Sequence, residues 1–458
     1  MFRVRVVGSF AVEPLGDVLG FWSDLLEWDV RWEFGAPDQT FRQWLATGDG
    51  VRGWVVLARP GDWPADPAQS ITELVEAVRA AAGSAPVAVV VCPSPVADVA
   101  ALEDSLVTRV AAVPGATAIS ADQVRSWYPQ AAWHEPATDG TEPTPYPPTG
   151  YAALGTVVAR TVRGWLTPGP NVIVAECDGV LWDGAAGEVG APGVEVPEAR
   201  RRMQRVLVEH VRAGRPLCLY TRGERQGVSA VLREHPDLLV REEYVTALLA
   251  GGQSAPDHLR SLSARFGLGL DDVLFLGADP VEVARLRAHL PQVTALLLPA
   301  AADAAAARLA HCWPLDAAPG HAAAAPTGPA PAAPSGPVQH IATTLATPDQ
   351  IVAAVDAWRG DGFAGTDDVV PAQTATQHAV MLLWADLLSP PPRSIEDNFF
   401  ELSGDSLKLV QFMGQVRRHF GIELPTSTLF ESTLTIAEIA AAIEDAQVDD
   451  LLDTADIR

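Results

Sequence analysis

The sequence predicts an α/β protein that ends in an all-α domain. Short apolar runs alternate with helical patterns as far as about residue 313, which is typical of mainly parallel sheets. Residues 316–338 then consist almost entirely of Ala, Pro and Gly. Beyond them, apolar residues recur at helical spacing, which indicates a helical bundle. We therefore expect two α/β domains, a linker and a helical domain.

The first α/β domain is expected over residues 1–165. A continuous apolar run such as the one at residues 87–91 suits a buried parallel strand. Strands are predicted at Val4–Val7, Trp54–Leu57 and Val87–Val91. A helix is predicted over Ser70–Ala82, with Ser70 or Thr72 as its N-cap.

The second α/β domain is expected over residues 166–313 and has a doubly wound pattern. Its first strand precedes a Gly-rich loop that extends through Gly190. Its strands are predicted at Val172–Ala175, Pro216–Tyr220, Val273–Leu276 and Val293–Leu298, and its helices at Pro197–Ala213, Pro256–Phe266 and Pro280–Leu290. Because such sheets bind ligands at the carboxyl ends of their strands, the residues after Ala175, Tyr220 and Leu276 should converge.

A linker is expected over residues 314–345, since its Ala/Pro-rich centre cannot bury enough apolar surface to offset the entropy of ordering. It would act as a semi-extended tether, followed by a short helix at Pro348–Trp358. The helical domain, residues 366–446, is predicted to be a four-helix bundle with a long first loop. Its helices are expected at Gln373–Leu388, from Ser406, near Ser427–Phe430 and from Thr435 to Glu444.

Composition excludes several classes of partner. The 458 residues carry a net charge of −25, with a pI of about 4.7, so nucleic acid is not expected to bind. No run approaches the roughly 20 apolar residues that a membrane span needs. The four cysteines lack metal-type spacing and fit a reducing cytoplasm, where we expect the protein to reside.

Ser406 carries the most specific functional signal. It follows Asn398-Phe399-Phe400 and Ser403-Gly404-Asp405, and it precedes Leu407-Lys408-Leu409 at the start of a predicted helix. A helix N-terminus favours a phosphodiester through its dipole and free amides. The alternative is that Ser406 only caps a helix, as serines often do.

The whole segment around Ser406 resembles acyl and peptidyl carrier proteins. The resemblance implies that 4′-phosphopantetheine is attached covalently at Ser406 and that Asp405 helps to position the cofactor. The family usually has Gly where this chain has Ser403. The partners implied are a phosphopantetheinyl transferase and the enzymes of a polyketide or nonribosomal peptide pathway, which load and receive the acyl group.

The second domain contains the run Val174-Ala175-Glu176-Cys177-Asp178-Gly179-Val180-Leu181-Trp182 after its first strand. This run resembles the haloacid dehalogenase (HAD) superfamily, and specifically its FkbH-like branch. The likeness extends over about residues 1–300. It implies a HAD fold that takes a glyceryl unit from 1,3-bisphosphoglycerate, holds it on a cysteine and passes it to a carrier thiol.

Three positions depart from the pattern of an active HAD site. Glu176 replaces the first Asp with a side chain that is one methylene longer, a displacement that can cost about 100-fold in rate. Gly277 and Ala278 stand where metal-binding carboxylates are expected, and the family's lysine falls near Ser254–Ala255. These losses argue against a Mg²⁺ site, and no metal ligands are assigned.

Two hypotheses for this region remain, so its enzymatic status is open. In the first, it loads its own carrier with a glyceryl unit: Cys177 is the acyl relay, Asp178 the acid/base and Thr221 the phosphate-binding residue, with Glu176 at the position of the family's first Asp. In the second, it is a pseudoenzyme that keeps the fold and docks the carrier or a partner. Cys177 would then be a small buried hydrophobe. The missing carboxylates and lysine favour the second hypothesis, and fusion to a carrier favours the first.

Overall fold

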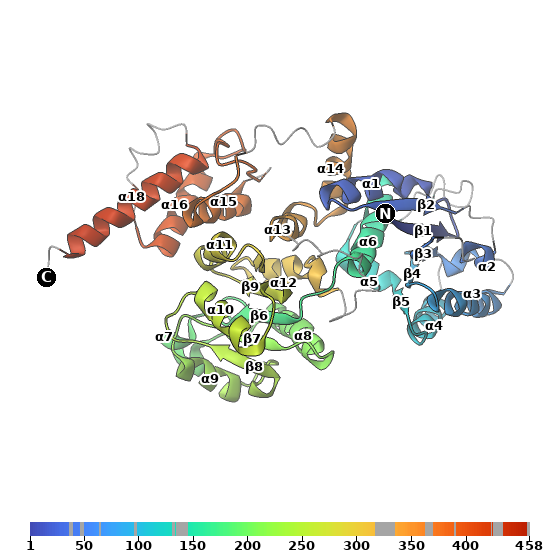
Figure 1. Cartoon of the computed structure of the whole chain (residues 1–458), viewed down its shortest axis with the longest axis horizontal. Coiled ribbons are helices and arrows are strands. Elements are labelled where there is room, and N and C mark those ends of the chain that lie inside the picture. Colours follow the sequence, from blue (N-terminus) through green and yellow to red (C-terminus); the bar gives the residue numbers. More distant parts are fainter. Residues whose placement is uncertain are drawn as a thin grey trace. The chain divides into compact units, whose positions relative to one another are not determined.

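The structure, a computed structural model, describes the chain except for residues 36–39, 46–49, 64–65, 96–98, 131–132, 134–144, 317–334, 362–369, 389–390, 423, 425–433 and 456–458. The chain forms two compact units, which are described separately below (Figure 1). The first contains one parallel sheet and the helix after the linker. The second contains the other parallel sheet and the C-terminal helices.

The sheet of the first unit has five parallel strands in the order β2-β1-β3-β4-β5. Its strands are β1 (Phe2–Gly8), β2 (Val30–Phe34), β3 (Gly53–Ala58), β4 (Val87–Val91) and β5 (Ala116–Ile119). Its helices are α1 (Gly16–Leu25), α2 (Phe41–Trp44), α3 (Pro67–Ala82), α4 (Ala100–Ala111), α5 (Ala121–Trp127), α6 (Pro148–Leu166) and α14 (Pro348–Asp361).

Helix α3 shows how the sequence places these elements. Its apolar residues Leu74, Val75 and Val78 lie on one face and pack into the core beside β3 and β4. The helix begins earlier than expected, and its N-cap is Asp66 rather than Ser70 or Thr72. The Asp66 carboxylate accepts hydrogen bonds from two backbone amides, and a proline at the first helical position suits this start.

The sheet of the second unit also has five parallel strands, in the order β10-β9-β6-β7-β8. Its strands are β6 (Val172–Glu176), β7 (Leu217–Tyr220), β8 (Val245–Leu249), β9 (Val273–Gly277) and β10 (Thr294–Leu297). Its helices are α7 (Ala186–Gly193), α8 (Glu198–Arg212), α9 (Arg225–Glu234), α10 (Ala255–Phe266), α11 (Pro280–His289) and α12 (Ala302–Ala310). The predicted α/β fold class, with a doubly wound second sheet, is confirmed.

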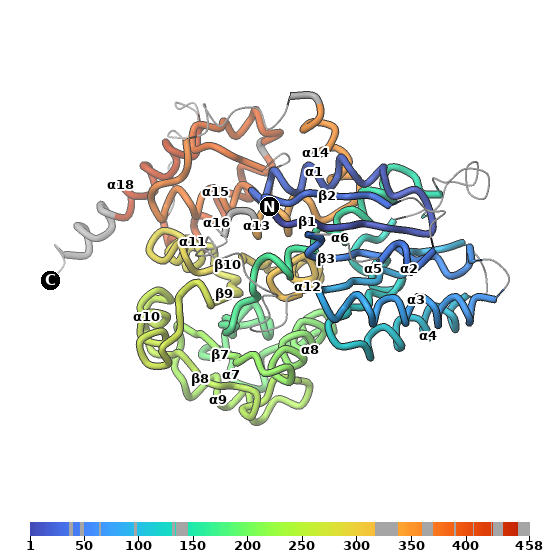
Figure 2. The backbone as a smooth tube through the Cα atoms, turned by 45° about the vertical axis from the view of Figure 1, so that its right-hand side comes forward, coloured from blue at the N-terminus to red at the C-terminus, as the bar shows by residue number. Residues whose placement is uncertain are grey.

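Helices cover both faces of this second sheet (Figures 1 and 2). Residues of α7, α8, α9 and α12 share one core cluster, in which Leu207, Val231 and Leu309 are buried. Residues of α10 and α11 share the cluster on the opposite face, with Leu259 and Leu286. Strand β6 is central, so its carboxyl end lies between those of β7 and β9.

The segment after β6 is not the uninterrupted Gly-rich loop that the sequence predicts. Helix α7 begins within it, because Asp178 accepts a hydrogen bond from the Ala186 amide (3.1 Å) and thereby holds the start of the helix. Gly190 has a positive φ of 68°, which interrupts the helix locally. The loop prediction is therefore wrong for residues 186–190.

The expected linker is partly structured at its C-terminal end. Helix α13 covers Ser335–Thr344, and its Val338 and Ile341 are buried. Gln339 accepts a hydrogen bond from the Leu297 amide (2.8 Å), which attaches the helix to the second unit. The tether prediction fails over α13, because the sequence there has apolar residues at helical spacing, and residues 317–334 lie outside the described part of the chain.

The C-terminal domain contains α15 (Ala375–Leu387), α16 (Ser406–Phe420) and α18 (Ile436–Ala455). Trp384, Phe399 and Phe412 form its aromatic core, with ring centroids 5.0 and 6.2 Å from Trp384. The last helix extends beyond the predicted end at Glu444. The short helix predicted near Ser427–Phe430 lies outside the described residues. Within the described residues, no helix combines the length and apolar character that a membrane span requires.

Candidate functional site

A tight turn fixes the start of α16. The backbone amide of Gly404 donates a hydrogen bond to the carbonyl oxygen of Phe399 (2.9 Å), and Phe399 is fully buried. A Cβ atom on residue 404 would overlap the Phe399 ring and carbonyl oxygen, so only glycine fits there. The turn anchors the loop to the domain core immediately before the helix.

Asp405 is the N-cap of α16. Its carboxylate accepts hydrogen bonds from the backbone amides of Leu407 (2.9 Å) and Lys408 (2.8 Å). Ser406 is the first residue of the helix and is not its cap. The alternative in which Ser406 only caps the helix is therefore wrong, because the adjacent aspartate already fills that structural role.

Ser403 adopts a left-handed backbone conformation, with φ at 66°. Residues other than glycine are strained in this region of φ/ψ space. This is the position where the resemblance to carrier proteins leads one to expect glycine. The Lys408 ammonium donates a hydrogen bond to the Ser403 carbonyl oxygen (2.7 Å), which helps to hold the strained turn.

A second candidate site lies at the carboxyl edge of the second sheet. As the strand order predicts, residues after β6, β7 and β9 converge there. The carboxylate of Glu176, 8% exposed, accepts hydrogen bonds from the backbone amides of Ala278 (2.7 Å) and Asp279 (3.1 Å). Its extra methylene lets it reach the loop where metal-binding carboxylates were expected. Glu176 thus links the end of β6 to the segment that follows β9.

Burial dominates the acid–base behaviour of Glu176. Desolvation raises the pKa of its carboxyl to about 8, although the Ala278 amide favours the charged form. The nearby carboxylate of Asp279 also raises this pKa by repulsion. In the folded chain the Glu176 carboxyl therefore keeps its proton up to about pH 8, whereas an exposed glutamate loses its proton near pH 4.5.

The other predicted residues at this edge are occupied by structural contacts. Asp178 accepts hydrogen bonds from the Trp182 indole (2.7 Å) and the Ala186 amide. Thr221 is 2% exposed, and its hydroxyl accepts one from the Gly223 amide (3.0 Å). Cys177 is fully buried, and burial, together with the charges of Asp178 and Glu176, raises the pKa of its thiol well above the ordinary value. A high thiol pKa opposes thiolate formation.

Asp279 lies close to two basic side chains at this edge of the sheet. The Arg222 guanidinium donates to its carboxylate (2.9 Å), and the His419 ring nitrogen of α16 lies 3.7 Å away. Burial acts to raise the pKa of Asp279, but His419, the Val281 amide and Arg222 outweigh it, and the pKa lies below its ordinary value. The carboxylate is therefore charged and paired.

Sequence reasoning missed Glu282, a side chain that is 1% exposed on α11. It accepts hydrogen bonds from the Tyr220 hydroxyl (3.0 Å) and the Ala255 amide (3.0 Å), close to where the lysine was expected. The sequence signal that could have pointed to this residue is an acid in the first turn of a helix that begins with Pro280. The missing groups at the edge are thus replaced by hydrogen bonds to backbone amides.

This donor set does not fit Mg²⁺, which needs several free oxygen ligands. The Glu176 carboxylate is bound to amides, and Gly277 and Ala278 offer no side-chain oxygen. No cluster of three or more His, Cys, Asp or Glu side chains suited to a metal occurs in the described part of the chain.

Comparison with known families concerns the C-terminal domain. Residues 378–443 match the family described as "Phosphopantetheine attachment site". This segment is a phosphopantetheine carrier domain. Tyrocidine synthase 3 of Brevibacillus parabrevis is 42% identical to this chain over 77 residues, and gramicidin S synthase 2 of Aneurinibacillus migulanus is 36% identical over 88 residues.

Both matches are short relative to the full chains. The match covers 17% of this chain and 1% of tyrocidine synthase 3, and 19% of this chain and 2% of the gramicidin synthase. The chain therefore shares with each of these relatives a single segment of a much longer polypeptide. The C-terminal domain of this chain is homologous to synthetase carrier domains that carry 4′-phosphopantetheine.

The α/β part resembles a solved structure whose printed description is the N-terminal part of the protein BF1531 from Bacteroides fragilis, containing a phosphatase domain complexed with Mg. The TM-score is 0.52 at 14% identity, over 66% of this chain and 91% of the other. The likeness shows a HAD-like fold in this chain and concerns the fold alone.

Replacing Ser403 of the carrier domain with glycine should relieve the strained turn. We expect Ser403→Gly to stabilise the domain by about 1 kcal/mol, because glycine adopts positive φ without the steric penalty. Hydrogen exchange of the α15 and α16 amides in the full chain measures this, with Ser403→Ala as the control that keeps the strain. Equal exchange in the two variants would contradict the account.

Glu176 should make the stability of the HAD-like domain depend on pH. Its folded-state pKa of about 8 exceeds the ordinary 4.5, so the folded chain binds more protons in this window, and stability falls as pH rises from about 4.5 to 8. The full effect is on the order of 5 kcal/mol. Urea unfolding of Glu176→Gln should lack this component, and the exposed Glu188→Gln should retain it. Parallel pH profiles for the native chain and Glu176→Gln would refute it.

Proposed function

We propose that this chain carries an acyl or aminoacyl group as a thioester on a 4′-phosphopantetheine arm attached to Ser406, within a polyketide or nonribosomal peptide pathway. The observation that carries the proposal is the Asp405 cap, which makes Ser406 the first residue of α16. The dipole at a helix start favours the phosphate that joins the arm to the serine. A thioester keeps the acyl group activated for transfer.

The surface around Ser406 supports transient binding of partner enzymes. Phe400, Leu407 and Val410 are 48%, 69% and 67% exposed, and all three lie within a few residues of the serine. Large exposed apolar side chains next to one another mark sites that a partner covers. A phosphopantetheinyl transferase and the enzymes that load and receive the acyl group would share this surface in turn.

We infer that the HAD-like domain serves as a docking scaffold for the carrier domain. Leu382 of α15 is 5% exposed and belongs to the core cluster of the second sheet, together with Leu286 of α11 and Leu290, which follows that helix. The Arg308 guanidinium of α12 donates to Asp386 of α15 (2.9 Å), a largely shielded pair. Leu382 therefore anchors the carrier domain to the α/β domain through an apolar contact.

The site at the sheet edge agrees with this scaffold role. Glu176 and Glu282 are held by backbone amides, and Asp279 is paired with Arg222 and lies near His419 of the carrier domain. These groups stabilise the loops instead of remaining free for phosphate chemistry. The same positions that a phosphatase uses for catalysis would here support docking.

The alternative function is transfer of a glyceryl unit to the carrier. Cys177 and Asp178 keep their places after the strand β6, and the carrier would supply the natural acceptor. The Cys177 thiol would attack the acyl phosphate of 1,3-bisphosphoglycerate, forming a 3-phosphoglyceryl thioester and releasing the C1 phosphate, and water would hydrolyse the C3 phosphate to leave a glyceryl thioester. The arm thiol would then attack this thioester, taking the glyceryl group and releasing the Cys177 thiol. Burial of Cys177 and its raised pKa oppose the first of these steps.

Ser406→Ala should abolish attachment of the arm. Incubating the full chain with coenzyme A and a broad-specificity phosphopantetheinyl transferase should add one phosphopantetheine to the native chain, as seen by intact mass spectrometry. Ser403→Gly, a neighbouring serine in the same loop, should still be modified. Modification of Ser406→Ala, or none in the native chain, would overturn the proposal.

Disrupting the anchor should free the carrier without unfolding it. Leu382→Asp places a charge in an apolar contact, so hydrogen exchange should rise at least tenfold in α11 while the α16 amides keep their protection. The same substitution at exposed Leu407 should leave α11 unchanged. Unaltered exchange in α11 of Leu382→Asp would contradict the scaffold.

The two functions of the HAD-like domain separate in one assay. The phosphopantetheinylated chain is incubated with 1,3-bisphosphoglycerate and Mg²⁺, and its mass is measured. The scaffold proposal predicts no glyceryl gain on the arm. A gain that disappears in Cys177→Ala, but persists in the buried control Cys218→Ala, would establish glyceryl transfer and overturn the purely structural role.

A further inference from the structure

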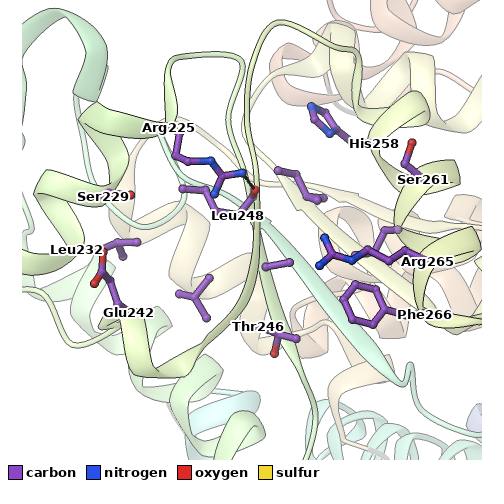
Figure 3. Close-up of a pocket in the computed structure, with 14 residues that line it drawn as sticks. Arg225, Ser229, Leu232, Glu242, Thr246, Leu248, His258, Ser261, Arg265 and Phe266 are labelled. Atoms are coloured by element: carbon purple, nitrogen blue, oxygen red, sulfur yellow. Dashed lines mark hydrogen bonds between the residues drawn. The ribbon is translucent and has the colours of Figure 1, made fainter.

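A groove of about 410 Å³ follows strand β8, away from the edge where Glu176 lies (Figure 3). In the sheet order β8 is terminal and pairs with β7, so its other edge carries no further strand in the described part of the chain. The groove is lined by all five residues of β8, by Ser229 and Leu232 of α9, and by Ser261 and Arg265 of α10.

The two helices beside the groove lie on opposite faces of the sheet. Helix α9 contributes Val231 to the core on one face, and α10 contributes Leu259 to the core on the other. A groove between them therefore opens along the rim of the sheet, with β8 as its floor. This shape suits an extended chain, because the side chains of a strand point alternately to the two faces.

Positive charge flanks the groove. The Arg225 guanidinium donates a hydrogen bond to the Leu248 carbonyl oxygen (2.6 Å), and Arg265 stacks beside Phe266, 5.3 Å from the ring centroid (Figure 3). Glu242 is the acidic residue of the lining, and it lies 3.8 Å from Arg233 outside the groove. In a chain with a net charge of −25, two arginines along one edge strand indicate an acidic occupant.

The lining also holds a polar group with unmet hydrogen-bonding capacity. His258 is 8% exposed, and its Nε2 atom is buried and has no hydrogen-bond partner among the described residues. Burial lowers the pKa of its ring, with Arg225 adding to the effect and Asp257 opposing it, so the imidazole is neutral near pH 7. A neutral ring offers a donor or an acceptor to a neighbouring chain.

We propose that the open edge of β8 binds an extended acidic segment of a partner polypeptide by strand addition. Backbone groups of the segment pair with β8 and displace Arg225 from the Leu248 carbonyl oxygen, and the alternate side chains of the segment lie against α9 and α10. Its carboxylates meet Arg225 and Arg265. The five residues of β8 span about 16 Å, which limits the segment to four or five residues. This site is independent of the carrier function.

The probe is a short fluorescent peptide that alternates valine and glutamate, titrated against the full chain by anisotropy. We expect saturable binding and slower hydrogen exchange of the β8 amides. Arg265→Glu and Arg225→Glu should each weaken binding about tenfold, since each removes a charge-assisted contact. Arg260→Glu makes the same charge change on α10 outside the groove and should leave binding unchanged.

A second pair of probes separates strand addition from simple charge attraction. Copies of the peptide that are methylated on every second backbone nitrogen, prepared in both registers, should bind poorly in one register, because the methyl groups remove the donors that face β8. A valine–lysine peptide should not bind. Equal binding of both methylated copies, equal losses in Arg260→Glu and Arg265→Glu, full displacement by inorganic phosphate, or no binding of the glutamate peptide would overturn the proposal.

Discussion

The hydrogen bond from the Gly404 amide to the Phe399 carbonyl oxygen sets the geometry on which the carrier domain depends. Phe399 is fixed because its ring is buried against Trp384 and Phe412. The bond closes the turn, and Asp405 then caps the helix. Together, the turn and the cap place Ser406 at the first position of the helix. The strained Ser403 shows that the turn is imposed by this packing rather than by local preference.

At the carboxyl edge of the second sheet, buried acidic side chains are held by the backbone amides of neighbouring segments. Glu176 is long enough to reach the amides of Ala278 and Asp279, and its carboxylate accepts a hydrogen bond from each. Glu282 does the same for Ala255. These hydrogen bonds attach the segment after β9 and the start of α10 to the sheet edge.

Much of this architecture follows from the sequence because its strongest signals are local. The apolar run of β4 and the helical spacing in α15 and α16 gave correct elements, and the turn before Ser406 was recognisable from its residues. The sequence did not reveal β2, β5 or β8. These are edge strands, half exposed and interrupted by polar residues such as Arg31, Glu33 and Thr246, so their patterns resemble loops.

Contacts between residues that lie far apart in the sequence could not be predicted either. The bonds from Glu176 to residues about a hundred positions away depend on strand order and on side-chain length together. Asp66 caps α3 from outside the apolar pattern, and Leu382 belongs to a core formed mainly by another domain. None of these has a local signature. The roles of Cys177, Asp178 and Thr221 remain predictions.

The most direct test of the account is to map the modified residue in the intact chain. After treatment with coenzyme A and a phosphopantetheinyl transferase, proteolysis and tandem mass spectrometry would locate the added group. The account predicts a single modified peptide, with the group on the first residue of α16. A group on any other residue, or a fully unmodified digest, would contradict it.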